Sequence, residues 1–156
     1  MRVVLAAVAK RPPDWIRAGF REYAKRLPPQ LSLTLSEVAP LARDGSQSAE
    51  SAQRREAERL RAVIPKGACL IALDEHGRQW STPELAAQLE RWMQEGRDLA
   101  MLVGGADGLD PSIIDSADHV WSLSRLTLPH ALVPVVLAEQ LYRAWSLLNR
   151  HPYHRA

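Results

Sequence analysis

Short apolar segments with strand character alternate with helix-like segments along the whole chain, and this alternation limits the folds it can adopt. The first segment, Arg2–Ala9, is β-branched and apolar and predicts a buried strand. In the second, Leu31, Leu33 and Leu35 alternate with polar residues, as in a strand with one face exposed to solvent. The pattern predicts an α/β fold with a mostly parallel sheet flanked by helices. Three further strands are predicted at Cys69–Leu73, Leu99–Val103 and His119–Leu123.

Capping and stop signals bound the predicted helices. Asp14 is expected to cap a helix that runs to about Leu27, where two prolines stop it. The sequence from Ser81 to Glu84 combines a cap residue with an early proline and predicts a helix to Glu95. Further helices are predicted at Glu50–Val63, near Pro111 and from about His130 to Arg150, with a turn at Asp74–Gly77 and a flexible loop at Asp44–Ala49.

The length of 156 residues predicts a single domain, 1–156, because two well-formed cores would need a longer chain. The single cysteine, Cys69, excludes an internal disulfide and favours a cytoplasmic protein. No run approaches the ~20 apolar residues of a membrane span, and the apolar N-terminus fits a strand better than a signal peptide. We therefore expect no membrane partner. Neither CxxC nor HxxxH spacing occurs, so we also expect no bound metal.

Positive charge is concentrated at the two ends of the chain. Residues 1–29 carry a net charge of +5 and residues 120–156 a net charge of +3, whereas the middle carries −6. Basic ends fit an anionic partner, although scattered solvated charge would give the same count.

Three loops that leave predicted strands, at residues 73–75, 104–108 and 122–129, are candidates for ligand binding, because ligands of open parallel sheets bind at the carboxyl ends of strands. The loop Gly104–Leu109 reads GGADGL, which fits close approach of a backbone to a ligand or simply a tight turn. It is neither a P-loop nor a dinucleotide fingerprint. In the loop SLSRLTLPH, residues 122–130, Leu123, Leu126 and Leu128 have the spacing of neither a strand nor a helix. The spacing indicates either that a flat ligand such as adenine binds to this loop or that the loop is a crossover that faces the core.

The last helix and the tail hold the remaining candidate groups. Leu137, Leu141, Ala144, Trp145 and Leu148 fall on one helix face and predict a core or oligomer interface, with Glu139, Tyr142, Arg143 and Ser146 opposite. The tail Asn149–Arg155 places two His, two Arg and one Tyr within seven residues. Such groups contact phosphates, stack on bases and move protons, which favours RNA over a frayed polar terminus.

The strand end Leu73-Asp74, the loop GGADGL and the blocks WSLSRLTLPHALV, AEQLYRAWSLLN and HPYHR resemble the RlmH (YbeA) family over nearly the whole chain. The resemblance implies a SPOUT-class α/β fold with a C-terminal trefoil knot. It also implies a homodimeric enzyme that uses S-adenosylmethionine to methylate N3 of a pseudouridine in 23S ribosomal RNA, on the assembled ribosome. The hydrophobic periodicity does not predict a knot, and threaded connections are rare in proteins.

The resemblance also implies roles for individual residues. Cofactor binding falls to Leu73, Gly104, Gly105, Leu123, Ser124, Arg125, Leu126, Thr127 and Leu128. RNA binding falls to Arg143, His151, His154 and Arg155, and catalysis to Arg143, Tyr153, His154 and Arg155. The sequence departs from the family at Ala106-Asp107 and at Pro134, where an arginine is usual. Pro134 removes one positive charge and one backbone donor.

Several alternatives stay open at this point. His154 or Tyr153 could assist removal of the N3 proton, while Arg143 or Arg155 could hold ring oxygens or a phosphate. The tail of one subunit is expected to complete the site of the other, so that Leu141→Arg would separate the dimer. A non-catalytic RNA- or ribosome-binding protein, and a Rossmann-type enzyme with Glu37 as a ribose ligand, are the rival functions.

Overall fold

The computed structural model describes residues 1–42, 45 and 48–155, and it confirms the alternation of strands and helices. The five strands found among these residues form one parallel sheet in the order β2-β1-β4-β3-β5. The elements are β1 (Arg2–Val8), α1 (Asp14–Ala24), the 3-10 turn η1 (Pro29–Leu31), β2 (Ser32–Val38), α2 (Ala49–Ala62), β3 (Cys69–Gln79), α3 (Thr82–Glu95), β4 (Leu99–Val103), α4 (Pro111–Ser116), β5 (His119–Ser122) and α5 (Val133–Leu148).

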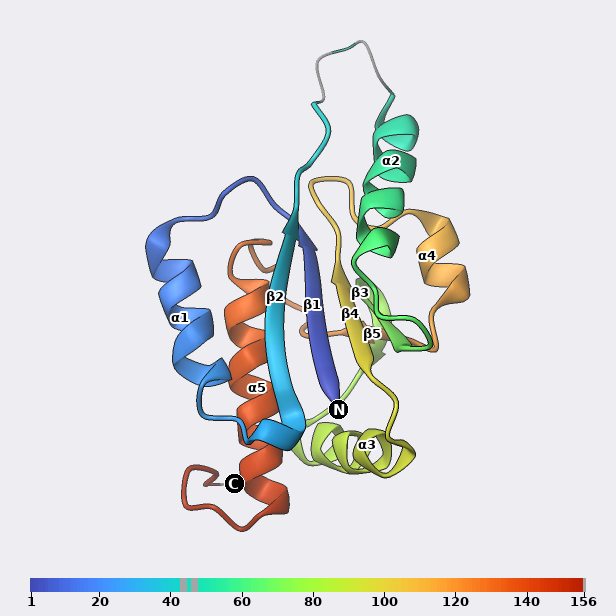
Figure 1. Ribbon diagram of the computed structural model, residues 1–156. Helices are drawn as coiled ribbons and strands as arrows, with labels where there is room; N and C mark the ends of the chain where they lie inside the picture. The colour runs from blue at the N-terminus through green and yellow to red at the C-terminus, as the bar shows by residue number, and fades with distance from the viewer. Residues whose placement is uncertain (43–44, 46–47, 156) are drawn as a thin grey trace.

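Helices cover both faces of the sheet (Figure 1). On one face, Leu5 and Met101 join side chains of α1, α3 and α5 in the larger core cluster. On the other face, Ala6 and Leu102 pack with α2 and α4 in a smaller cluster. Since neighbouring strand residues point to opposite faces, strands that are apolar at every position, such as β4, must be covered on both sides.

The predicted turn at Asp74–Gly77 lies inside β3, where the strand leaves the sheet and returns. Leu73 and Arg78 are both register partners of Trp121 in β5, with a register shift between them. A Cβ on Gly77 would lie 2.7 Å from the backbone of Val120. The chain therefore passes directly against β5 at a position where only glycine fits.

The predicted helix ends are corrected by a few residues. Asp14 does not cap α1: the N-cap is Pro13, and Asp14 is the first helical residue. The capping box of Ser81 and Glu84 is confirmed. The last helix begins at Val133 rather than near His130, and Pro134 lies in its first turn, where its missing N–H costs no helical hydrogen bond.

Two further predictions concern the loop before α2 and the absence of a membrane span. Of the loop predicted at Asp44–Ala49, residues 44, 46 and 47 lie outside the described residues, and Ala49 already belongs to α2. Among the described residues, no helix is long and apolar enough to span a membrane.

Leu141 lies in the core of a single chain, with 0% of its surface exposed. Leu141→Arg would therefore unfold the chain rather than separate a dimer, and the expectation about that variant was wrong. The opposite face of α5 is covered as well, because Tyr142 and Ser146 are buried.

Candidate cofactor pocket and C-terminal tail

The carboxyl ends of β3, β4 and β5 meet around a cavity of about 510 Å³, which we call the strand-end pocket. A cavity of this size is typical of small-molecule sites. Eight of the nine residues predicted for cofactor binding line it: Leu73, Gly104, Gly105, Leu123, Ser124, Leu126, Thr127 and Leu128. The ninth, Arg125, is exposed and lies outside the lining.

The glycine loop at one side of the pocket folds back on itself. Gly105 and Gly108 form an isolated antiparallel bridge, and the Gly108 N–H donates to the Gly105 carbonyl at 3.1 Å. A Cβ on Gly104 would lie 2.4 Å from the carbonyl carbon of Gly108. From α2, the Gln53 amide donates to the Asp107 carbonyl at 2.5 Å and supports the loop from behind. The loop therefore has one compact shape that depends on glycine at position 104.

The non-periodic loop at the other side is not a simple core crossover. Leu123 and Leu128 are half-buried, but the Leu126 side chain is 75% exposed. A local hydrogen bond holds the backbone at Leu126, since the Ser124 hydroxyl accepts from the Leu126 N–H at 2.9 Å. An exposed leucine on an ordered loop favours the alternative in which a ligand or partner covers it.

The chemistry of the lining favours a ligand with positive charge. Asp74, Glu75 and Asp107 contribute carboxylates, and the described lining includes no Lys or Arg. Trp121 also lines the pocket, and its buried indole N–H has no partner among the described residues. A buried donor without a partner is costly, so an acceptor on a ligand would satisfy it.

Sequence reasoning named the Asp74-Glu75 and Asp107 segments as loops but did not select their carboxylates as site residues. The position of the carboxylates next to strand ends was the available signal, because side chains there share one edge of the sheet. His76 and His130 also line the pocket and were not selected. His76 lies 3.4 Å from an Asp74 oxygen through its Nδ1.

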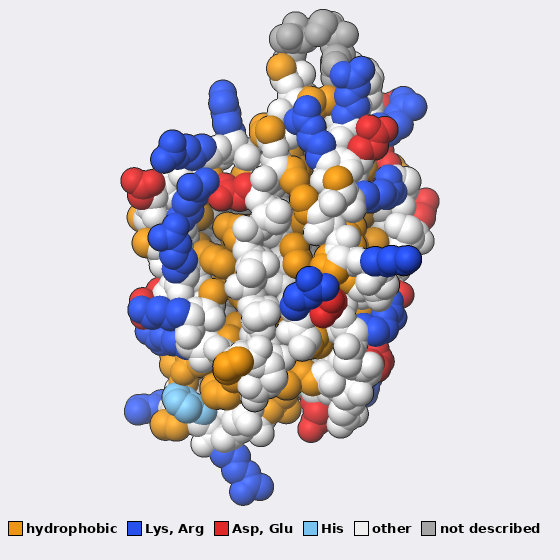
Figure 2. All heavy atoms as spheres, viewed as in Figure 1, with side chains coloured by type: hydrophobic (Ala, Val, Ile, Leu, Met, Phe, Trp, Pro, Cys, Tyr) orange, Lys and Arg blue, Asp and Glu red, His pale blue; other side chains and the backbone are white. Residues whose placement is uncertain are grey.

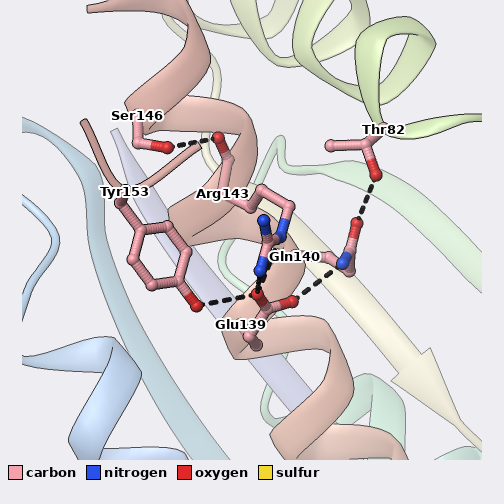
Figure 3. Close-up of polar contacts among 6 residues, drawn as sticks. All are labelled: Thr82, Glu139, Gln140, Arg143, Ser146 and Tyr153. Carbon is pink, nitrogen blue, oxygen red and sulfur yellow. Dashed lines mark hydrogen bonds and ion pairs between the residues drawn. The ribbon is translucent and has the colours of Figure 1, made fainter. Parts of the chain in front are cut away.

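Glu139 on α5 anchors the C-terminal tail (Figure 3). Its Oε1 accepts from the Tyr153 hydroxyl at 2.8 Å and from Arg143 Nε at 2.8 Å. Its Oε2 accepts from the Gln140 amide, whose oxygen accepts in turn from the Thr82 hydroxyl. The Arg143 guanidinium also lies 4.8 Å from the centre of the Tyr153 ring. The tail therefore folds back on the helix from which it comes.

These contacts set the protonation states of two predicted catalytic residues. Burial, reinforced by the bond to Glu139, raises the pKa of Tyr153 to about 12. The same carboxylate raises the pKa of Arg143. At neutral pH Tyr153 is therefore a neutral hydroxyl that donates its proton, and it is a poor base. His154 differs, because both of its ring nitrogens are buried and have no partner among the described residues.

The C-terminal tail leaves α5 at the end of the helix opposite to the loop that leads into it (Figure 1). Val133, the first residue of α5, lines the pocket, whereas Tyr153 follows the last turn. The 16 residues of the helix span about 24 Å. One chain therefore brings the predicted cofactor residues together, and it keeps Tyr153, His154 and Arg155 away from them.

The charge at the N-terminal end is partly neutralised within the chain. Arg2, Arg17, Lys25 and Arg26 form ion pairs with carboxylates, which accounts for four of the seven cations in residues 1–29. Figure 2 shows the cationic side chains along both flanks of one face, over α1 and α2. Glu37, the ribose ligand of the Rossmann alternative, lies within β2 and pairs with Arg17 at 3.0 Å, which removes that role.

Glu139→Gln is expected to lower the pKa of Tyr153 from about 12 toward, but not to, its ordinary value of 10, because burial of the ring remains. The raised pKa means that stability from the Tyr153 contacts is complete below about pH 10 and is lost as the pH rises through 12. Absorbance at 295 nm across an alkaline titration reports this ionisation. Glu37→Gln serves as the control, and an equal shift in both variants would contradict the assignment.

Known proteins match this chain over nearly its whole length. The profile of a family described as "Predicted SPOUT methyltransferase" matches residues 1–154. Proteins named "Ribosomal RNA large subunit methyltransferase H" from Burkholderia lata and Burkholderia cenocepacia are 52% identical over 156 residues, and the match covers all of both chains. Among solved structures, "a probable methylase family protein" from Haemophilus influenzae superposes with a TM-score of 0.57 at 15% identity. That match covers 99% of this chain and 70% of the other.

Proposed function

This chain belongs to the SPOUT methyltransferase family, and from that premise we propose that it methylates 23S ribosomal RNA with S-adenosylmethionine as methyl donor. The proposed target is N3 of a pseudouridine on the assembled ribosome, in the cytoplasm. The full-length identity of 52% to relatives named as ribosomal RNA large subunit methyltransferases carries the proposal. The strand-end pocket supports it, because it offers a site for the donor.

The residues of the strand-end pocket fit this cofactor. Gly104 and Gly105 line the pocket, where the polar groups of their backbone can meet an adenine edge. Leu126 and its neighbours offer apolar cover for a flat ring, and the Trp121 indole N–H offers a donor. The carboxylates of Asp74, Glu75 and Asp107 counter a positive charge. When bound, S-adenosylmethionine supplies an electrophilic methyl group on a positively charged sulfur.

We propose that two copies of the chain complete each site. The pocket and the tail occupy opposite ends of α5, so Tyr153, His154 and Arg155 can act beside the pocket only from a second copy. The exposed large hydrophobic side chains of the described residues are Trp15, at the start of α1, and Leu126, in the pocket loop. Exposed apolar groups of this size are typical of surfaces that a partner covers.

The proposed roles of the tail follow from the groups that Glu139 holds. Tyr153 stays protonated through its bond to Glu139, so it positions Arg143 and the tail rather than removing a proton. His154 is then the candidate that accepts the N3 proton, because its two nitrogens have no partner among the described residues. Arg143 and Arg155 would hold ring oxygens or a phosphate.

The expected trefoil knot is also part of this proposal. The excursion of β3 between Leu73 and Arg78 lies against β5, just before the segment that a knot would thread, since both of its ends pair with Trp121. The chain beyond β5 then returns to the α1 face of the sheet as α5. This path supports a knotted C-terminal half despite the rarity of threaded connections.

The test supplies purified protein with labelled S-adenosylmethionine and ribosomes from cells that lack the activity, and maps the label by mass spectrometry. Label on N3 of a pseudouridine in 23S RNA is the expected result. Label on another nucleotide would keep the enzyme class and change the target. Ribosome binding without transfer would replace the proposal by a non-catalytic RNA-binding protein.

A further inference from the structure

A second cavity of about 450 Å³ lies between α3 and β5, and we call it the α3–β5 groove. From α3, Gln88 and Arg91 contribute to it; they lie one turn apart and share a helix face. Arg78 lies near the end of β3, Trp80 follows that strand, and His119 is the first residue of β5. No residue of this groove lies in the strand-end pocket.

The carboxylates of the groove are committed to the fold, whereas its cations are not. Glu84 accepts from the Ser81 N–H in the capping box, at 2.7 Å. Asp118 accepts from the Leu70 N–H at 2.8 Å and lies 3.8 Å from Arg97. The side chains of Arg78 and Arg91 are exposed and have no ion pair or hydrogen bond among the described residues. The groups free to bind a ligand are therefore two guanidinium groups.

The aromatic wall of the groove is fixed in place by its neighbours. The Trp80 ring meets His119 at 5.8 Å and the buried Trp92 at 5.9 Å, both edge-on. Trp92 and His119 are 5.7 Å apart, so the three rings support one another. A rigid, half-buried indole next to free guanidinium groups is suited to stack a base while the cations bind phosphate.

The groove and the strand-end pocket are linked by a contact between two tryptophan rings. Trp80 lies 5.1 Å from Trp121, which lines the pocket, and Arg78 pairs with Trp121 in the sheet. A nucleotide that stacks on Trp80 would therefore be separated from the proposed methyl donor by Trp80 and Trp121. This position suits a residue of the RNA that flanks the target.

We propose that the α3–β5 groove is a nucleotide-binding subsite for single-stranded RNA, in which Trp80 stacks a base and Arg78 and Arg91 bind its phosphates. The inference rests on the proposed function for its RNA substrate. It assigns to this face of the chain a role in substrate binding that is separate from transfer of the methyl group.

The test measures binding of a fluorescein-labelled oligouridylate to the full chain by anisotropy at several salt concentrations, alongside methyl transfer to ribosomes. The double variant Arg78→Ala, Arg91→Ala is expected to weaken binding at least about tenfold and to reduce the slope against log salt by about 1.4, which is about 0.7 for each lost phosphate contact. The KM for ribosomes is expected to rise, while kcat and the affinity for S-adenosylmethionine stay unchanged. Arg55→Ala, an exposed arginine on α2 across the sheet, is the matched control.

An affinity of the double variant equal to that of the control would overturn the subsite, whatever the methylation assay gives. Loss of RNA affinity in the double variant supports the subsite even if wild-type protein methylates nothing, and in that case only the proposed activity fails. Trp80→Phe keeps an aromatic ring and is expected to retain most of the affinity. If RNA affinity is unchanged in the double variant but lost in Trp80→Phe, Arg78 and Arg91 do not bind the RNA phosphates.

Discussion

Gly104→Ala is expected to abolish binding of S-adenosylmethionine and to lower methyl transfer at least about a hundredfold. The new Cβ would lie 2.4 Å from the carbonyl carbon of Gly108, and this neighbour is backbone that cannot rotate away. The loop must open, and the bridge between Gly105 and Gly108 is lost with it. Titration calorimetry measures cofactor binding, and transfer of label to ribosomes measures activity.

Gly67→Ala is the matched control for this effect. Unlike Gly104, Gly67 has a positive φ, of 78°, and nothing lies within 4 Å of the added Cβ. It should cost about 1 kcal/mol of stability and leave cofactor binding intact. Circular dichroism of both variants separates a local change from unfolding. Normal cofactor affinity in folded Gly104→Ala would show that the loop does not form the site.

Gly77→Ala is expected to reduce the free energy of unfolding by about 3 kcal/mol, the upper end of the usual cost of overpacking. A Cβ there would meet the backbone of Val120 and Trp121 at 2.7 to 2.8 Å, so the β3 excursion and β5 must separate. Chemical denaturation followed by tryptophan fluorescence measures the change, because Trp121 lies at the contact.

Gly96→Ala is the control for this second variant. Gly96 ends α3 with a φ of 73°, and the space around its Cβ position is open. We expect a loss of about 1 kcal/mol from the left-handed backbone alone. Equal losses at positions 77 and 96 would mean that close packing against β5 contributes nothing.

The strands were predictable because their signals are local. The alternation of Leu31, Leu33 and Leu35 correctly predicted β2, and the apolar run Leu99–Val103 gave the bounds of β4 without error. The grouping of the predicted cofactor residues around one cavity also followed, since carboxyl ends of parallel strands share an edge.

The tail was not predictable in the same way. The pairing of Glu139 with Arg143 has helical spacing and could be expected from sequence. The bond from Tyr153 back to Glu139 spans 14 residues and depends on how the chain turns after α5, at Arg150 with its positive φ of 53°. No periodicity encodes such a turn. The excursion of β3 was missed for a similar reason, because the return to Trp121 is a tertiary contact.

The order of the strands bears on how the chain reaches this structure during synthesis. β1 lies beside β4, yet Leu99, the first residue of β4, emerges almost a hundred residues after β1. Apart from β1 with β2, no pair of strands in this sheet can form before β4 or β5 has been made. Parallel pairings at such separations form slowly, because the loop entropy is lost before the contacts are gained. The nascent chain therefore carries an open β1 edge until two thirds of it has left the ribosome, and chaperones that shield strand edges would act in that interval.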